Sequence, residues 1–455
     1  MLKINGLKLA VNENESLLLD KVASELKINK NKIHSLAIKK KSLDARKKHD
    51  IHYVYNVIIS IDNELNFINK KDNITLYCPE EYKVKKEASS LYPIVIGFGP
   101  AGIFCALVLA RAGLKPIVLE RGEDVDTRIA TVENFFSNSI LNTNSNIQFG
   151  EGGAGTFSDG KLNTGISNKR IDFVLKTFFE HGAPKCITYD AKPHIGTDIL
   201  PSVIKSIRKE IISLGGKVLF SHCFTDYSIN SDEITVICKN NIGKVKFITN
   251  SLILALGHSA RDTFEMLYQS GIEMVPKAFS MGMRIEHPQT VINESQYGKL
   301  ENLPAADYKL SCSFDDGSSA YTFCMCPGGE IVAAASEENS VVTNGMSRFK
   351  RDGTNANSAI LVTLTPDDFP DTSPLSGMYW QRKIEKSAYE LTGSYNAPCQ
   401  TVGSFLKGLK NEPSLVSPSY RPGVVFTDLR SFLPKKNYRY RCKSVTCICK
   451  KNKEF

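Results

Sequence analysis

Residues 92–122 read YPIVIGFGPAGIFCALVLARAGLKPIVLERG, and this stretch decides the fold. The apolar run 94–96 predicts a short buried strand, and the apolar segment 103–112 predicts a helix directly after it. The glycines between them are spaced G-x-G-x-x-G, the pattern of a strand–turn–helix unit that binds a dinucleotide. The pattern occurs once in the sequence. We therefore expect a single dinucleotide-binding domain.

Each glycine of this turn has a physical task. Gly97 permits the tight turn, Gly99 removes a Cβ so that the backbone can approach a pyrophosphate, and Gly102 lets the helix and strand pack closely. The helix N-terminus, where Pro100 and Ala101 lie, offers free N–H groups and a partial positive charge to phosphates. We predict that these five residues bind the cofactor.

The second strand of the unit, KPIVLE, ends in Glu120, 18 residues past Gly102. An acid at this spacing typically accepts hydrogen bonds from ribose hydroxyls. The segment LERG (119–122) resembles the end of the second strand in FAD domains of the glutathione-reductase type. The resemblance places Glu120 and Arg121 in the cofactor site and favours FAD over NAD.

Two later segments also favour FAD. In GGKVLFSHCFTDY the strand 218–220 matches the one that returns beside the adenine in such folds, and Phe224 follows it. In SLILALGHSA a buried strand ends at Gly257 and resembles the segment that passes the flavin. We therefore add Phe224, Ala255 and Gly257 to the predicted cofactor site.

A glycine-rich segment, QFGEGGAGTFSDGKL (148–162), lies between these strands. Its bare backbone N–H groups, with Gly153, Gly155 and the Thr156 hydroxyl, can wrap a diphosphate or the edge of the flavin ring. The alternative is a mobile loop that binds no ligand. Arg128, on the helix expected after Glu120, resembles the arginine that such flavoproteins direct at the phosphates; the alternative is an exposed ion-pair residue.

Four side chains are candidates for catalysis or substrate binding. His194 in AKPHIGTD and His258 after Gly257 carry imidazoles that can transfer the proton accompanying hydride transfer. Arg284 and His287 in FSMGMRIEHPQ can orient an anionic substrate, although structural hydrogen bonds explain both equally well. The sequence alone leaves the catalytic residues open.

The cysteines do not predict a metal site. The start of the chain lacks a secretory signal, so reduced thiols and a cytoplasmic location are expected for the twelve cysteines. The pair Cys324 and Cys326 is spaced C-x-C, which favours two buried thiols beside a turn over a redox pair or a zinc site. The uncharged stretch 91–110 is broken by GFGPAG, so we expect no membrane helix.

The net charge does not predict a nucleic-acid partner. The total is +9, but residues 435–455 carry eight basic residues and one acid, a net +7, which leaves +2 for residues 1–434. A basic patch, KKKSLDARKK (39–48), is the one feature that suggests RNA, and a solvated face explains it as well. We expect nucleic acid not to be a partner.

The fold class predicted is α/β, with three domains. Residues 1–88 form a small ferredoxin-like α+β domain, 89–270 a glutathione-reductase-type, Rossmann-like FAD domain, and 271–412 a β-rich substrate domain. The segment 413–434 begins the return to the FAD domain, and 435–455 is an aberrant tail.

Several blocks of sequence are too particular to be general features of flavoproteins, and they resemble the predicted FAD-dependent dehydrogenases, bacterial flavoproteins without a well-assigned substrate. The resemblance covers residues 1 to about 434 and implies an FAD domain and a substrate domain, but no known reaction. The blocks are QFGEGGAGTFSDGKL, AKPHIGTD, LALGHSARDTF, FSMGMRIEHPQ, FCMCPGGEIVAAASEENSVVTNGMS and NANSAILV.

The end of the chain departs from that family. Its members continue with a helix and a segment like A-L-P-V-F-x-K-K-I, which is absent here. Codons that encode SVTCICKKNKEF (444–455) can be chosen so that reading one nucleotide later gives ALPVFAKKIKN. We hypothesise a frameshift near Lys435, in the genome or in the sequence record, which would truncate the chain and weaken its hold on FAD.

Together these observations predict an FAD-dependent oxidoreductase of the dehydrogenase type. Hydride passes between flavin and an unknown small-molecule substrate, and NAD(P)H stays open as a reductant that binds without a second Rossmann domain. The alternatives are an RNA-modifying or RNA-binding flavoprotein, a non-catalytic FAD sensor, and a truncated inactive copy.

Overall fold

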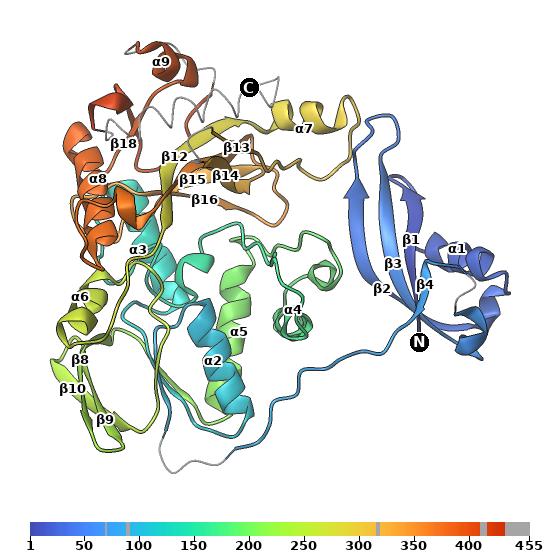
Figure 1. Ribbon diagram of the computed structural model, residues 1–455, viewed down its shortest axis with the longest axis horizontal. Helices are drawn as coiled ribbons and strands as arrows, with labels where there is room; N and C mark the ends of the chain where they lie inside the picture. The colour runs from blue at the N-terminus through green and yellow to red at the C-terminus, as the bar shows by residue number, and fades with distance from the viewer. Residues whose placement is uncertain (69–70, 88–91, 315–318, 410–415, 433–455) are drawn as a thin grey trace. The chain divides into compact units, whose positions relative to one another are not determined.

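The computed structural model describes residues 1–432 apart from 69–70, 88–91, 315–318 and 410–415 (Figure 1). The chain divides into two compact units, the first made of Met1–Lys83, Lys161–Ile195 and Ile292–Ala306, and the second of the remaining residues. This division differs from the predicted domains, because 161–195 and 292–306 make their contacts within the first unit and interrupt the sequence of the second.

The first unit is built on a four-stranded antiparallel sheet of order β2-β3-β1-β4. Helix α1 packs Leu18, Val22 and Leu26, spaced four residues apart on one face, into the core of this unit. The elements are β1 (Leu2–Ala10), α1 (Leu17–Leu26), η1 (Lys30–Lys32), β2 (Ile33–Asp44), β3 (His52–Ile61), η2 (Glu64–Phe67), β4 (Ile74–Leu76), α4 (Arg170–Glu180) and η4 (Lys185–Thr188). Helix α7 (Gln289–Tyr297) crosses the boundary between the units in sequence.

Three of the six basic residues of the patch 39–48 form ion pairs within this unit. Lys39 pairs with Asp172 at 2.6 Å and Lys41 with Glu15 at 2.7 Å. Arg46 pairs with the neighbouring Asp44. Lys40, Arg46, Lys47 and Lys48 are exposed, so the RNA alternative stays an untested prediction.

The second unit contains a parallel four-stranded sheet of order β11-β5-β6-β7. The strand predicted at 94–96 is β5, and all three of its residues are buried. Helices α2 and α5 lie side by side against this sheet (Figure 1), and an antiparallel sheet β10-β9-β8 follows β7 in sequence. The bounds are β5 (Ile94–Ile96), α2 (Pro100–Arg111), β6 (Ile117–Leu119), α3 (Val125–Asn138), η3 (Gly153–Gly155), α5 (Leu200–Ser213), β7 (Lys217–Leu219), β8 (Cys223–Asn230), β9 (Glu233–Lys239), β10 (Lys244–Thr249), β11 (Leu252–Leu254) and α6 (Arg261–Gln269).

The rest of the second unit is richer in antiparallel strands, as the sequence predicted for the region after 271. A four-stranded sheet has the order β12-β17-β14-β13, and β14 carries a bulge between Phe323 and Cys326. Cys324, inside the bulge, has a φ of 47°. The bounds are β12 (Phe279–Pro288), β13 (Ser311–Ser313), β14 (Ser319–Cys326), β15 (Gly329–Ala333), β16 (Thr343–Ser347), β17 (Asn355–Leu364), η5 (Pro366–Asp368), α8 (Ser376–Thr392), β18 (Ala397–Cys399), α9 (Val402–Lys407), β19 (Val424–Phe426) and η6 (Leu429–Ser431).

The mixed α/β class is thus confirmed. Among the described residues no helix combines the length and apolar character that crossing a bilayer requires. The predicted frameshift and aberrant tail concern residues 435–455, which lie outside the described part of the chain.

Candidate functional site

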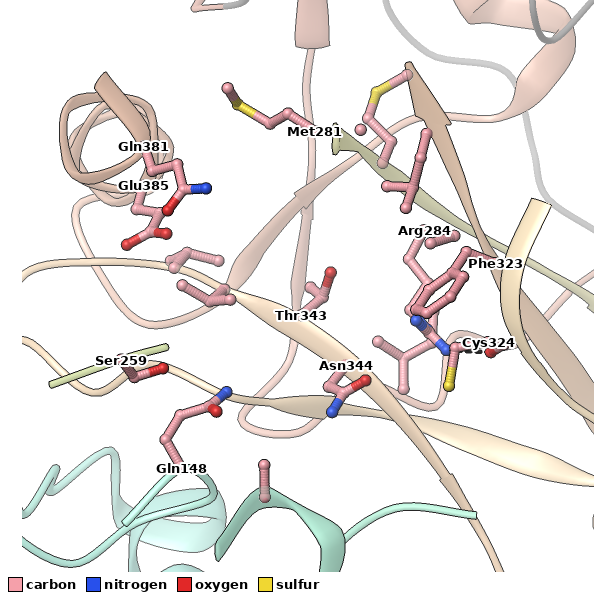
Figure 2. A pocket seen from close by; sticks show the side chains of 18 of the residues that line it. Gln148, Ser259, Met281, Arg284, Phe323, Cys324, Thr343, Asn344, Gln381 and Glu385 are labelled. Carbon is pink, nitrogen blue, oxygen red and sulfur yellow. Dashed lines mark hydrogen bonds between the residues drawn. The ribbon is translucent and has the colours of Figure 1, made fainter. Parts of the chain in front are cut away.

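A cavity of about 1560 Å³ joins the glycine-rich turn after β5 to the β12–β17–β14 sheet. This exceeds the roughly 300–1,000 Å³ typical of a pocket for one drug-sized ligand. Figure 2 shows one region of it, with Gln148 and Ser259 facing Arg284, Phe323 and Cys324 across the space. The cavity therefore has room for a cofactor and a second molecule.

The glycines of the turn meet the requirements that the sequence predicted. A Cβ on Gly97, whose φ is 94°, or on Gly102 would overlap a backbone carbonyl oxygen, that of Ala255 or of Gly97 respectively. Gly99 differs, because the nearest atom to its Cβ position is the Gly153 Cα at 3.8 Å. Gly97 and Gly99 line the cavity, whereas Gly102 serves the close packing behind it.

Glu120 lies at the end of β6, lines the cavity and is buried. Its Oε2 accepts a hydrogen bond from the Phe98 N–H at 2.7 Å, and its Oε1 accepts from the N–H groups of Gly122 at 2.9 Å and Gly150 at 3.0 Å. A carboxylate offers about four lone-pair sites. Three are used by the backbone, so one acceptor position remains for a ribose hydroxyl.

The glycine-rich segment forms another part of the wall. Gly150, Gly153 and Gly155 line the cavity together with Gln148. Gly153 closely approaches Gly99, since a Cβ on it would lie 2.9 Å from the Gly99 Cα. The turn 97–102 and the glycine-rich segment therefore form one surface on which the backbone is exposed without side chains.

Arg128 has a different place from the one predicted. Its side chain is completely buried, and its guanidinium donates to the carbonyl oxygens of Asn146 (2.8 Å), Ile147 (3.0 Å), Glu151 (2.6 Å) and Gly153 (2.9 Å). It is neither a cavity-lining residue nor an exposed ion-pair residue. Burial lowers the pKa of Arg128 to about 10. Its function is to hold the glycine-rich segment in shape from behind.

Three other predicted cofactor residues lie outside the cavity wall. The Thr156 hydroxyl is buried and donates to the Glu151 carbonyl at 3.1 Å. Phe224 is part of the core between the parallel sheet and the β8–β10 sheet. Arg121 pairs with Asp262 at 2.8 Å beside a smaller cavity of about 500 Å³.

Ala255, Gly257 and His258, in the segment after β11, line the cavity, and Pro100 and Ala101 line it at the start of α2. The His258 Nδ1 lies 2.7 Å from the Ser259 hydroxyl. Burial, with a smaller contribution from Arg261, lowers the pKa of His258. This imidazole is therefore neutral at pH 7 and able to accept a proton.

Of the other three catalytic candidates, one lines the cavity and two do not. Arg284 lines the cavity. His287, three residues further along the chain, is buried but does not line the cavity. Its Nε2 lies 2.9 Å from the Tyr308 hydroxyl, and burial lowers its pKa to about 4. His194 belongs to the first unit, where it forms an antiparallel bridge with Lys161, whereas the cavity residues all come from the second unit.

The sequence reasoning missed helix α8. Gln381 and Glu385, one turn apart on this helix, point into the cavity (Figure 2). Glu385 accepts from Arg261 at 2.7 Å, and Arg261 also pairs with Glu337 at 2.9 Å. The spacing of four residues between two polar side chains was visible in the sequence, but nothing in it showed that this helix face meets a cavity.

Comparison with known proteins places the chain in a family. An uncharacterized protein from Clostridium beijerinckii is 46% identical over 445 residues, which cover 95% of this chain and 83% of that protein. The chain belongs to its family. Residues 278–455 match the model of an FAD-dependent protein, C-terminal domain-like, and residues 1–60 match a domain of unknown function (DUF8436). The family is FAD-dependent, and FAD is its cofactor, as the sequence predicted.

Solved structures share only a distant likeness. The halogenase PltM aligns at 13% identity with a TM-score of 0.32, covering 67% of this chain and 57% of that one. OxyS anhydrotetracycline hydroxylase from Streptomyces rimosus aligns at 14% identity with a TM-score of 0.27, covering 67% and 48%. The chain thus spans about half the length of each, and the halogenation and hydroxylation named for them stay with those proteins.

Proposed function

We propose that this protein is a flavoprotein oxidoreductase of the dehydrogenase type, in which hydride passes between a small-molecule substrate and FAD. The observation that carries the proposal is the continuity of the cavity. One space runs from the dinucleotide turn at Gly97–Gly99 to the sheet face at Arg284, Phe323 and Cys324. A cofactor in the first part leaves the second part for a substrate.

The residues present fit FAD. The bare backbone at Gly99 and Gly153 matches a pyrophosphate that must approach the main chain, and the first N–H groups of α2 are available because a helix start leaves them without intrahelical partners. The remaining acceptor position of Glu120 suits a ribose hydroxyl. When bound, FAD supplies the hydride chemistry at its flavin ring, while the protein supplies binding, orientation and electrostatics.

The same proposal includes the finer fold assignment. The parallel sheet followed by the three-stranded antiparallel sheet suits a glutathione-reductase-type FAD domain. The order β2-β3-β1-β4, with α1 after β1 and the short η2 before β4, suits a ferredoxin-like domain whose second helix is reduced to a 3₁₀ turn.

His258 is our candidate for the proton that accompanies hydride transfer. Its neutral imidazole lines the cavity, and the Ser259 hydroxyl fixes the ring through Nδ1. A neutral histidine can take a proton from a substrate hydroxyl or amine as the hydride leaves. Replacement by Gln keeps the size but removes this capacity.

The experiment is purification followed by anaerobic reduction. We expect a yellow protein with a flavin spectrum, which NADH, NADPH or a member of a metabolite panel bleaches. Gly99→Val should lose the flavin, because its side chain fills the space between Gly99 and Gly153. Gly165→Val is the matched control, since no atom lies within 4 Å of its Cβ position. A protein that holds FAD yet is bleached by no reductant would instead be a sensor or binding protein.

A further inference from the structure

Arg284 is held in a fixed orientation on the cavity wall. It lies on β12, and its Nε donates to the Asn357 Oδ1 at 2.7 Å on the neighbouring strand β17. Its Nη2 donates to the Cys324 carbonyl at 2.8 Å, in the bulge of β14. Among the described residues Nη1 donates no hydrogen bond. Nε and Nη2 are therefore anchored, and Nη1 is available.

The neighbouring residues leave room for this guanidinium. A Cβ on Gly345 of β16 would overlap both the Arg284 Nη2 and the Asn357 Oδ1. Asn357 is completely buried. Its oxygen must face the Nε donor, and its Nδ2 makes no hydrogen bond in the described part of the chain. Residues from three strands and one bulge thus combine to place a single cation.

Arg284 also lacks a counter-ion in the part of the chain that the structure describes. The carboxylates that line the cavity are occupied: Glu120 by backbone N–H groups, Glu385 by Arg261, and Glu286 by Asn355 and Ser419. No ion pair joins Arg284 to any acid among the described residues; its partners are an amide oxygen, a carbonyl and, at 3.6 Å, the Cys326 sulfur. A partly buried charge without a counter-ion is costly, and an anionic ligand removes that cost.

We propose that Arg284 binds the carboxylate of the substrate. This inference rests on the proposed function, and it names the substrate class as a monocarboxylate with an apolar body. Phe323, Ala359 and Leu361 lie on the same face of the sheet as Arg284 and line the cavity. The two N–H groups of Nη1 can donate to one carboxylate.

The test measures binding by calorimetry on the purified flavoprotein, with benzoate and hexanoate as probes and benzamide and hexanamide as their uncharged counterparts. We expect both acids to bind more tightly than their amides. Arg284→Gln should weaken the acids by about 10- to 100-fold, since a hydrogen bond to a charged group is lost, and leave the amides nearly unchanged. Arg46→Gln, an exposed arginine of the first unit, makes the same change in net charge and should have no effect.

A second variant keeps Arg284 in place. Asn357→Asp is close to isosteric and sets an internal carboxylate beside the guanidinium, at the cost of no hydrogen bond, because Nδ2 makes none among the described residues. We expect it to weaken the acids by about 10-fold by supplying the counter-ion internally. Equal acid binding by native protein and both variants overturns the proposal, as does a native protein that does not distinguish acids from amides.

The two proposals fail separately. Arg284-dependent acid binding with no bleaching by any reductant refutes the oxidoreductase and keeps the anion site. If a reductant bleaches the flavin but acids and amides bind equally well, the anion site is refuted and the oxidoreductase is kept.

Discussion

Replacing Arg128 by Met distinguishes a residue that supports the glycine-rich segment from one that contacts FAD. Four backbone carbonyls lose their donor. At about 1–3 kcal/mol for each buried group left unpaired, the cost is roughly 4–12 kcal/mol. Relief of the buried charge offsets about 3 kcal/mol of this, since the pKa of Arg128 falls from 12.5 to about 10. The resulting range is roughly 1–9 kcal/mol, and its middle agrees with the about 3–5 kcal/mol usual when one partner of a buried charged pair is removed.

The assay is thermal unfolding of the protein stripped of FAD. At about 2 °C per kcal/mol, a loss of about 3 kcal/mol lowers Tm by roughly 6 °C. Arg46→Met is the control, because the ion pair of the exposed Arg46 with Asp44 should contribute little to stability. If Arg128→Met leaves the Tm of the FAD-free protein unchanged and weakens only FAD binding, Arg128 is a phosphate ligand and the reasoning here is wrong.

Two further predictions concern the turn and His287. Gly102→Ala should prevent stable folding, because the new Cβ overlaps the Gly97 carbonyl. Gly99→Ala should leave the Tm of the FAD-free protein unchanged and weaken FAD binding. Equal Tm values for the two variants would contradict this prediction. The pKa of His287 falls from 6.5 to about 4 in the fold, so the folded protein binds fewer protons than the unfolded chain between these values. Its contribution of about 3 kcal/mol is fully present above pH 6.5 and is lost as pH falls toward 4, so the Tm of native protein should fall more steeply over this range than that of His287→Gln.

The sequence predicted the dinucleotide turn because its requirements are local. Gly97, Gly99 and Gly102 stand within six residues, and the steric reason for each applies to the backbone alone. The position of Glu120 could be predicted for the same reason, since this residue ends the next strand along the chain.

Arg128 was misplaced because its partners carry no signature in sequence. It binds main-chain carbonyls, which every residue possesses, and the segment that supplies them lies 18–25 residues further on. The resemblance to other flavoproteins suggested that the Arg128 guanidinium contacts the cofactor phosphates. In the structure the guanidinium instead donates to four backbone carbonyls between residues 146 and 153.

The surroundings of Arg284 could not be predicted from the sequence either. Arg284, Gly345 and Asn357 meet only through the register of β12 with β17 and the bulge in β14. Register is set by which face of each strand is buried, a property of the assembled sheets. The sequence offered the arginine as a candidate, but it could not show that no acid among the described residues pairs with it.

The order in which the cavity walls are synthesised has a consequence for biogenesis. The cavity-lining glycines of the turn and of the glycine-rich segment are all synthesised by Gly155, whereas Tyr420, Val424 and Phe432 of the same wall come near the end of the described chain. At about 5–20 residues per second, the roughly 280 residues between Gly155 and Phe432 take roughly 14–56 s to translate. During that interval the nascent protein displays an unfinished apolar lining. We expect its yield in cells to depend on chaperone capacity more than on the supply of flavin.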